Sequence, residues 1–285
     1  DSGMSRGLGD VYKRQAPNNS PLPLPKTPFV CNDTDLFPLD FSLEGSDEIS
    51  FDSLKQSLAS AEVDNTTLEQ FLIANSAPLL SERMPILLLG ELANPFQLAR
   101  LRLGPIPVIN VRLQNLCRTY SDGLDARMIR PGIHHVTLAR TKGWWETTHL
   151  AFVTLPQAKQ MIEWLNNRRH GNWRPVKPNE GTLRVENNST LSPPPFESLE
   201  WDGKTETCIA DEPAPNGPAI DITQVMVPIY TKNGCYDSRG KLIRCVHVGQ
   251  REFHANYFRR GSSKRWQDIL AVSYTHLRAH ETFRY

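Results

Sequence analysis

Residues 86–103 read ILLLGELANPFQLARLRL, and this stretch indicates the fold. An apolar run leads into Gly90, and Asn94 and Pro95 then open a segment whose leucines, beginning with Leu98, have helical spacing. Glycine suits a sharp turn, and Asn followed by Pro is a favourable helix start because proline has no amide proton to satisfy. The stretch therefore predicts a strand, a glycine turn and a helix. Such a turn can hold an anion on free backbone amides, and an ordinary turn without a ligand has the same sequence features.

A second segment, residues 149–178, has the same mixture of signals. It reads HLAFVTLPQAKQMIEWLNNRRHGNWRPVKP, in which a β-like run is followed by Pro156 at a helix start. The predicted helix ends near Gly171, a natural left-handed cap, and WRPVKP is extended. We expect the strands at residues 85–89 and 150–154 to lie in one sheet of an α+β domain. Four residues form the apolar face of this helix: Ala158, Met161, Ile162 and Leu165.

The chain divides into five parts by composition. Residues 1–15 and 272–285 resemble translated sequencing-adaptor sequence, and we expect them to lie outside the fold. Residues 16–45 are proline-rich and predict a disordered segment. Residues 46–83 have the apolar spacing of two short helices, which predicts a helical extension. Residues 84–271 then form the main domain.

Charge and cysteine content exclude several functional classes. The chain has 32 Lys and Arg residues against 31 Asp and Glu residues, a balance that argues against bulk attraction to nucleic acid or anionic membranes. No apolar run is long enough to span a membrane. The five cysteines contain no CxxC pair, and the interior histidines His134, His135, His149, His247 and His254 have no HxxxH spacing, so we expect neither a metal site nor a cofactor. Cys235 and Cys245 flank a turn-like segment, and their pairing as a disulfide stays open.

The order of these motifs resembles the gamma-glutamylcyclotransferase-like superfamily, which includes the ChaC and AIG2-type proteins. LGELANPFQLARL stands where that family has Tyr-Gly-Ser/Thr-Leu, then Asn/Asp-Pro, then a leucine-bearing helix. AFVTLPQAKQMIEWLNNRRHGNWRPV is similar to its later strand, helix and Gly-x-Tyr-Arg-Pro segment, and SSKRWQDIL at residues 262–270 to a segment near its C-terminus. The resemblance implies an α+β fold with a mixed, barrel-like β-sheet and surrounding helices.

The resemblance also implies an activity and the position of its general base. In the family, the substrate's free amino group attacks its own γ-glutamyl carbonyl and releases 5-oxoproline, while a glutamate handles the amine protons. The corresponding position here is Asn167, whose amide cannot accept a proton near neutral pH. Glu163 lies one helical turn earlier and is the alternative base. A solvated glutamate on a helix surface would have the same spacing.

The substrate-binding loop of the family corresponds to Leu89, Gly90, Glu91 and Leu92. Leu89 replaces the family's tyrosine and Glu91 replaces its small hydroxyl residue, whereas Gly90 is retained. A carboxylate beside an anion site repels an anionic glutamyl group, so neutral or cationic ligands are favoured. Glu91 on the solvent side of the loop would have no such effect.

These observations lead to two alternative functions. The first is a divergent gamma-glutamylcyclotransferase-like protein that binds a small amine- or glutamyl-bearing molecule, with catalysis absent or altered; an active form would be a lyase or acyltransferase. The second is a non-catalytic interaction module that contacts protein or nucleic acid through arginines and the pair Trp144-Trp145. A cavity shared by Glu91, Glu163 and Asn167 would favour the first function. Compartment stays open, with the cytoplasm favoured, and oligomeric state stays open.

Overall fold

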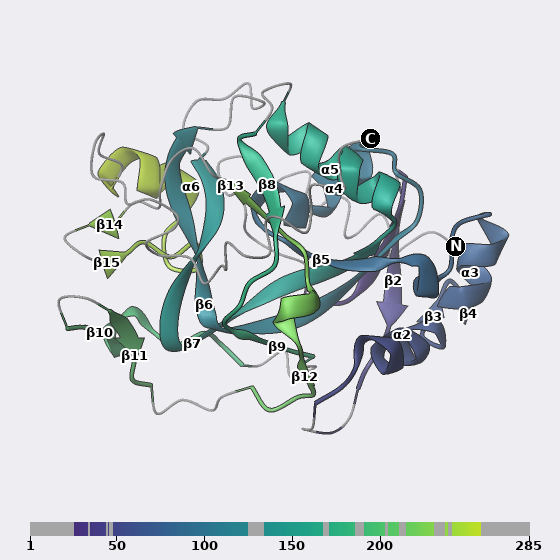
Figure 1. Ribbon diagram of the computed structural model, residues 1–285, viewed down its shortest axis with the longest axis horizontal. Coiled ribbons are helices and arrows are strands. Elements are labelled where there is room, and N and C mark those ends of the chain that lie inside the picture. The colour runs from purple at the N-terminus through teal and green to yellow at the C-terminus, as the bar shows by residue number, and fades with distance from the viewer. Residues whose placement is uncertain are drawn as a thin grey trace.

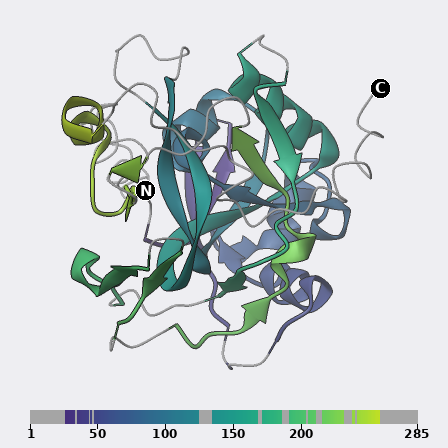
Figure 2. The same cartoon turned by 60° about the vertical axis from the view of Figure 1, so that its left-hand side comes forward.

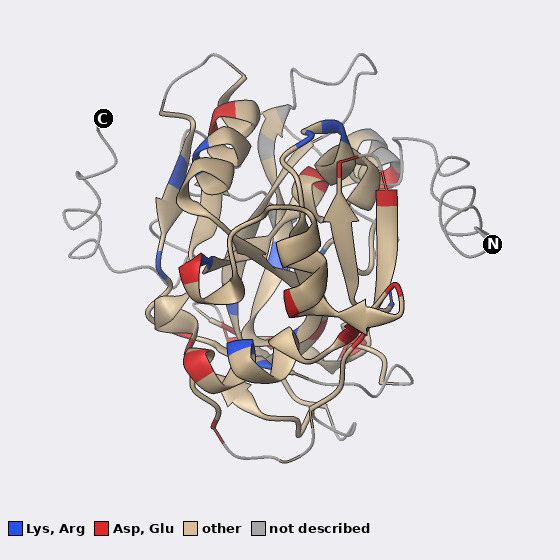
Figure 3. Cartoon of the chain, turned by 90° about the vertical axis from the view of Figure 1, so that its right-hand side faces the viewer, with Lys and Arg blue, Asp and Glu red and all other residues tan. Residues whose placement is uncertain are grey.

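The described part of the chain has an α+β structure with one large sheet and few helices. The computed structural model describes residues 26–33, 35–43, 45, 48–124, 134–167, 171–185, 191–202, 205–210, 215–230, 237–238 and 241–257. This architecture confirms the predicted α+β class. None of the described helices is long and apolar enough to cross a membrane. Acidic and basic residues are interspersed over the described face in Figure 3.

Two long antiparallel strands form the centre of the sheet. β6 (Ile106–Leu124) pairs with β7 (His134–Val153) from Val108↔Ala151 to Leu124↔His134, and both strands are prominent in Figure 1. The register shifts between Gln114 and Leu116, where the Gly143 amide donates to Asn115 Oδ1 at 2.9 Å. An irregularity of this kind bends a strand pair and increases its twist.

β5 (Met84–Leu88) lies antiparallel to the second half of β7. Its register runs from Met84↔Val153 to Leu88↔His149. The expectation that residues 85–89 and 150–154 share a sheet is therefore confirmed.

Residues 29–40 differ from the disordered segment expected over residues 16–45. They form β1 (Phe29–Asn32) and β2 (Asp35–Asp40), and β1 pairs with β6 through Phe29↔Val108. Val30 is fully buried, so the apolar side chains of this short stretch outweigh the local proline content. Residues 16–25 of the expected segment lie outside the described residues.

The other strands are short. They are β3 (Glu62–Val63), β4 (Thr66–Thr67), β9 (Thr182–Arg184), β10 (Leu199–Trp201), β11 (Glu206–Cys208) and β12 (Ala219–Ile220) in the large sheet, and β8 (Trp173–Val176), β13 (Val227–Tyr230), β14 (Asp237–Ser238) and β15 (Lys241–Leu242) in two separate pairs. The main strand order is β10-β11-β7-β6-β1-β2-β3-β4, with β5 on β7, β9 on β6 and β12 on β9. Over the described residues this order is an open path.

The two helices expected in residues 46–83 are α2 (Phe51–Ala59) and α3 (Leu68–Ala74). Ser50 Oγ accepts from the Ser53 amide and caps α2, while Thr67 forms a capping box with α3. Short polar side chains at these positions satisfy amides that have no partner within the helix. Both helices begin where the sequence supplies such a cap. Single turns of 3-10 helix are η2 (Leu80–Glu82), η4 (Phe196–Ser198) and η5 (Ile222–Gln224).

α5 (Leu155–Asn166) is shorter than the sequence predicts. Thr154 caps its start, and three of the four expected apolar residues, Ala158, Met161 and Leu165, are buried. The helix ends before Gly171 because Asn167 itself takes the left-handed cap position, with φ 43°. Asparagine tolerates this conformation better than most residues.

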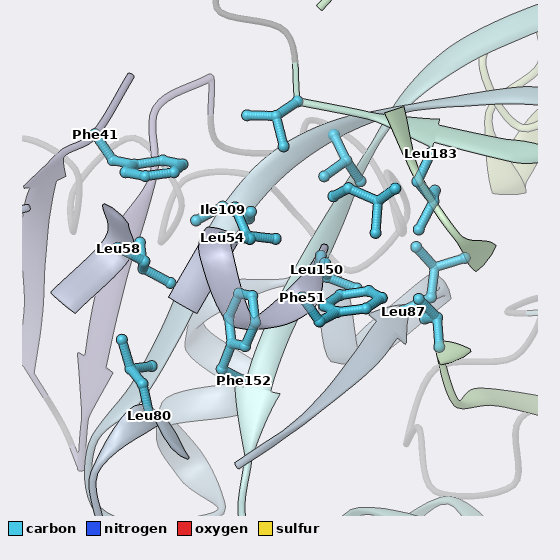
Figure 4. Packing of buried hydrophobic residues seen from close by; sticks show 14 of the residues in the cluster. Phe41, Phe51, Leu54, Leu58, Leu80, Leu87, Ile109, Leu150, Phe152 and Leu183 are labelled. Atoms are coloured by element: carbon cyan, nitrogen blue, oxygen red, sulfur yellow. The ribbon is translucent and has the colours of Figure 1, made fainter. Parts of the chain in front are cut away.

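Side-chain alternation places the two largest hydrophobic clusters of the core on opposite faces of the central strands. On one face, Leu150 and Phe152 of β7 meet Leu54 and Leu58 of α2 (Figure 4). On the other face, Ala151 and Val153 join the buried residues of α5. The central strands are thus covered on both sides.

The buried side chain of Arg83 forms hydrogen bonds with three segments of the chain. Its side chain is 2% exposed, and Nη1 donates to the Pro105 carbonyl at 2.9 Å and to the Phe152 carbonyl at 3.2 Å. Nη1 also donates to Gln157 Oε1 at 3.2 Å, and Nε donates to the Pro78 carbonyl at 2.9 Å. Burial lowers the pKa of Arg83 to about 10, so it stays charged at neutral pH.

Replacing Arg83 with Met should lower the free energy of unfolding by about 2–4 kcal/mol, because buried carbonyl oxygens lose their donors. Arg100→Met, at the exposed end of the helix at residues 95–100, is the matched control and should change it by less than about 0.5 kcal/mol. Urea unfolding of the three proteins measures the difference. Equal losses in both variants would contradict a structural role for Arg83.

Candidate functional site

The glycine turn after β5 is a short 3-10 helix that lies tightly against β7. It consists of η3 (Gly90–Ala93), and α4 (Pro95–Arg100) follows, capped by Asn94 Oδ1, which accepts from the Phe96 amide at 3.0 Å. Gly90 has φ +56°, and a Cβ there would lie 3.3 Å from Val136 Cβ. Both the backbone conformation and the close approach therefore favour glycine. The predicted strand, turn and helix are confirmed in this order.

The expected loop residues are all buried. Leu89 is 3% exposed, Glu91 7% and Leu92 1%, and Gly90 is also buried. The alternative in which Glu91 faces solvent is therefore excluded. A carboxylate is costly to bury unless it is paired or hydrogen-bonded.

In contrast to the turn residues, Glu163 and Asn167 are exposed to solvent. Both are exposed on the outer side of α5, and the Asn167 amide donates to the carbonyls of Glu163 and Trp164 as part of the helix cap. The structure brings α5 and the turn into one hydrophobic cluster through Leu165 and Leu92. It does not bring the exposed Glu163 and Asn167 side chains into an enclosed site with the buried Glu91.

Three aromatic rings in the same region were missed by the sequence reasoning. The His135 ring centroid lies 4.2 Å from that of Tyr230 and 5.1 Å from that of Trp173, and the Trp173 and Tyr230 centroids are 5.4 Å apart. Trp173 and Tyr230 belong to the hydrophobic cluster that contains Leu92 and Ala93. Their proximity comes from the register Tyr230↔Trp173 of β13 and β8, which sequence periodicity cannot predict.

Trp173 also has a polar atom in this apolar region. Its Nε1 is buried and has no hydrogen-bond partner within the described residues. Its backbone is fixed by Asn166, whose Oδ1 accepts from the Trp173 amide at 2.9 Å. A buried indole N–H usually has an acceptor, so this donor is available to a ligand oxygen.

A buried ionic network lies further along the β6–β7 pair. Arg118 Nε donates to Glu146 Oε1 at 2.6 Å, and Trp144 Nε1 donates to Glu146 Oε2 at 3.1 Å. Arg244 pairs with Glu206 and lies over the Trp144 ring, with Cζ 4.7 Å from its centroid. The two positive and two negative charges balance, as burial of ions requires.

This packing contradicts the expectation that Trp144 and Trp145 contact protein or nucleic acid at the surface. Their side chains are 0% and 3% exposed, so neither ring can stack on a base or sugar at the surface. Trp144 packs with Arg244 in the ionic network, and Trp145 lies 5.4 Å from Arg112 Cζ. Two adjacent tryptophans can both be buried here because both faces of β7 are covered.

The described cysteines are buried free thiols rather than nucleophiles. These are Cys31, Cys117, Cys208 and Cys245. Burial raises the pKa of Cys31 to about 12 and that of Cys117 to about 11, so little reactive thiolate is present at neutral pH. Cys235, considered as a disulfide partner of Cys245, lies outside the described residues.

The described residues contain no group of three or more His, Cys, Asp and Glu side chains placed to hold a metal. Two histidines, however, lie close together: His134 Nε2 is 3.0 Å from His254 Nδ1. The basic and aromatic segment at residues 262–270 lies outside the described residues. Comparisons of the chain with protein-family models, with curated proteins and with solved structures found no match.

Stability should fall as the pH drops from about 6.5 to about 4. Burial lowers the pKa of His134 to about 4, whereas an unfolded histidine titrates near 6.5. Between these values the unfolded chain binds the extra proton, so the free energy of unfolding decreases with falling pH, by no more than about 3 kcal/mol from this group. Urea unfolding across this range should give a flatter pH dependence for His134→Gln than for the original chain. An unchanged slope in the variant would refute the contribution of His134.

Proposed function

We propose that the chain is a divergent gamma-glutamylcyclotransferase-like protein that binds a small amine- or glutamyl-bearing molecule at the turn formed by residues 89–94. Cyclotransferase activity is absent or altered in this proposal. The observation that carries it is the burial of Glu91 in a glycine turn packed against β7. A buried carboxylate at that position is suited to a ligand that brings a positive charge or several N–H donors.

The order and pairing of the elements support the family part of the proposal. A strand, a glycine turn and a helix are followed by β7, α5 and β8, and the strands before the turn and before α5 are paired. In the proposed barrel-like arrangement, β13, which pairs with β8, lies between β5 and β6. Its neighbour Met226 bridges to Ile86 of β5, and the Tyr230 ring at its other end lies so close to Gly123 of β6 that no Cβ would fit.

The charge of Glu91 favours the amine end of a ligand. A carboxylate attracts an ammonium group and repels another carboxylate, and these effects are stronger when solvent is excluded. In this proposal the rest of the molecule contacts Leu92, Trp173 and Tyr230, which belong to one hydrophobic cluster. A small amine with an apolar body thus fits the composition of this region better than a doubly charged anion does.

The positions of Asn167 and Glu163 support weak or absent catalysis. An amide cannot accept the proton, and Asn167 is also engaged as the α5 cap. The Glu163 carboxylate is exposed, so water surrounds it and competes for any proton transfer. A general base contributes about two to four orders of magnitude in rate, and that contribution is lost here. The interaction-module alternative is weaker because its tryptophan pair is buried.

Binding of an amine can be tested on the full chain by thermal unfolding and calorimetry, with n-butylammonium chloride as the probe and sodium butyrate as the anionic counterpart. The amine should raise the unfolding midpoint by a few degrees at concentrations well above its Kd, whereas butyrate should not. Glu91→Gln should lose at least tenfold in amine affinity. Glu163→Gln, which changes an exposed carboxylate, is the matched control and should bind as the original chain does. Stronger binding of butyrate, or equal amine affinity in Glu91→Gln, would overturn the proposal.

Cyclotransferase activity is tested by 5-oxoproline release from glutathione and γ-glutamylalanine. The original chain and Glu163→Gln should both release little or none, because neither has a buried base at the α5 position. Robust release that Glu163→Gln abolishes would instead identify Glu163 as the base and overturn the assignment of an inactive site.

A further inference from the structure

The hairpin of β3 and β4 carries the sequence Asn-Thr-Thr at residues 65–67, beginning at its tip. Val63 pairs with Thr66, so Asp64 and Asn65 alone form the loop. Both loop residues have positive φ, 49° and 61°, as a type I′ turn requires. β4 is the last strand on the main path of the described sheet, so this turn lies at the margin of the sheet.

The tip of this hairpin is exposed to solvent. Asp64, Asn65 and Thr66 are all exposed, whereas Val63 is buried in the core. Figures 1 and 2 show the segment from α2 to α3 at the periphery of the molecule, on the side opposite α6 (Gln250–Glu252) and the π-helical turn η6 (Phe253–Tyr257). A bulky group attached to Asn65 therefore projects into solvent and does not displace the core.

Residues 65–67 also match the acceptor sequence for N-linked glycans. In that sequence, asparagine is followed by any residue except proline and then by serine or threonine. A glycan attached there is bulky and hydrophilic, so an acceptor in a folded protein belongs on the surface. The exposed turn at Asn65 meets this condition.

The local structure does not by itself require asparagine at position 65 and a hydroxyl at position 67. Asp-Gly is a typical pair for a type I′ turn, so the backbone alone favours glycine where Asn65 stands. Thr67 Oγ1 accepts from the Gln70 amide at 3.2 Å and caps α3, but aspartate or asparagine caps a helix as well as threonine does. An N-glycan acceptor, in contrast, needs asparagine and the hydroxyl together at this spacing.

Asn32 begins a second acceptor sequence, Asn-Asp-Thr, in a less suitable setting. It is half-buried in β1, and its Nδ2 donates to Asn75 Oδ1 at 3.0 Å. A sugar on that nitrogen replaces one of its two hydrogens and crowds this contact. The structure therefore favours Asn65 over Asn32. Three further Asn-x-Ser/Thr sequences lie outside the described residues, at Asn18, Asn187 and Asn188.

We propose that Asn65 is an acceptor site for an N-linked glycan, with a lipid diphosphate-linked oligosaccharide as the donor. Asn65 Nδ2 bonds to C1 of the first sugar, the bond between C1 and the diphosphate oxygen breaks, and the lipid diphosphate leaves with that electron pair. One Nδ2 proton passes to a base of the transferring enzyme, so the step needs no oxidant or reductant. The modification requires that this hairpin enters the lumen of the endoplasmic reticulum or an equivalent compartment. The site is independent of the amine site proposed at Glu91.

A glycan at this turn has a physical consequence for the sheet. Within the described residues, β4 is two residues long and pairs only with β3. The outer edge of such a strand can pair with another chain, and natural proteins obstruct such edges. A bulky, hydrated group on the neighbouring turn hinders that approach.

The test is expression of the full chain behind a cleavable secretory leader in cultured mammalian cells, with the cells and the medium both analysed. Peptide-N-glycosidase F converts a glycosylated asparagine to aspartate, and water labelled with heavy oxygen marks each converted residue for peptide mass spectrometry. We expect labelled conversion at position 65 in most molecules. A sample without the enzyme corrects for spontaneous deamidation.

Variants at position 67 separate the acceptor sequence from the helix cap. Thr67→Asp keeps a capping side chain for α3 and should lose the glycan, as should Asn65→Gln. Thr67→Ser keeps both the cap and the hydroxyl, so it is the matched control and should retain the glycan. Absence of conversion at Asn65 in the original chain, in cells and medium alike, would overturn the proposal. Conversion that persists unchanged in Thr67→Asp would also overturn it.

Discussion

β6 and β7 pair along nearly their whole lengths, and every other strand of the large sheet is joined to them directly or through intervening strands. The alternation of side chains along this pair sends Leu150 and Phe152 towards α2 and Ala151 and Val153 towards α5. Both helical layers therefore depend on one register. A shift by one residue would exchange the two faces and bring each helix against the wrong side chains.

Local signals in the sequence predicted the elements on either side of this pair. Glycine, Asn-Pro and the proline of a helix start mark these elements by their own chemistry, so the turn at Gly90 and the start of α5 near Pro156 could be predicted. Contacts between segments that are far apart in the sequence have no such local signal. The pairing of β1 with β6 and the left-handed cap at Asn167, which ended α5 early, depend on packing that periodicity does not encode.

The candidate site also combines residues that local sequence signals predicted with residues that only long-range contacts bring together. The sequence pointed to the four residues at 89–92, and their burial makes Glu91 the distinctive group among them. The exposed Glu163 and Asn167 show that a shared helical face does not establish which way that face points. The aromatic residues His135, Trp173 and Tyr230 come from three separate strands, and the pair His134 and His254 is separated by 120 positions. Only the folded chain brings such residues together.

Segments near the beginning and the end of the described residues both contact β6. β1 lies along the start of β6, while Arg244 forms a bridge to Thr119 near its other end and the Cys245 amide donates to the Arg118 carbonyl. A chain emerging from the ribosome thus makes β6 long before the last segment that completes its surroundings. Closing a loop of more than 120 residues costs conformational entropy before any contact compensates for it, and such distant contacts are associated with slow folding. This core is therefore completed only after Phe253 has been synthesised, and until then the apolar side chains around Tyr120 and Val136 lack that cover.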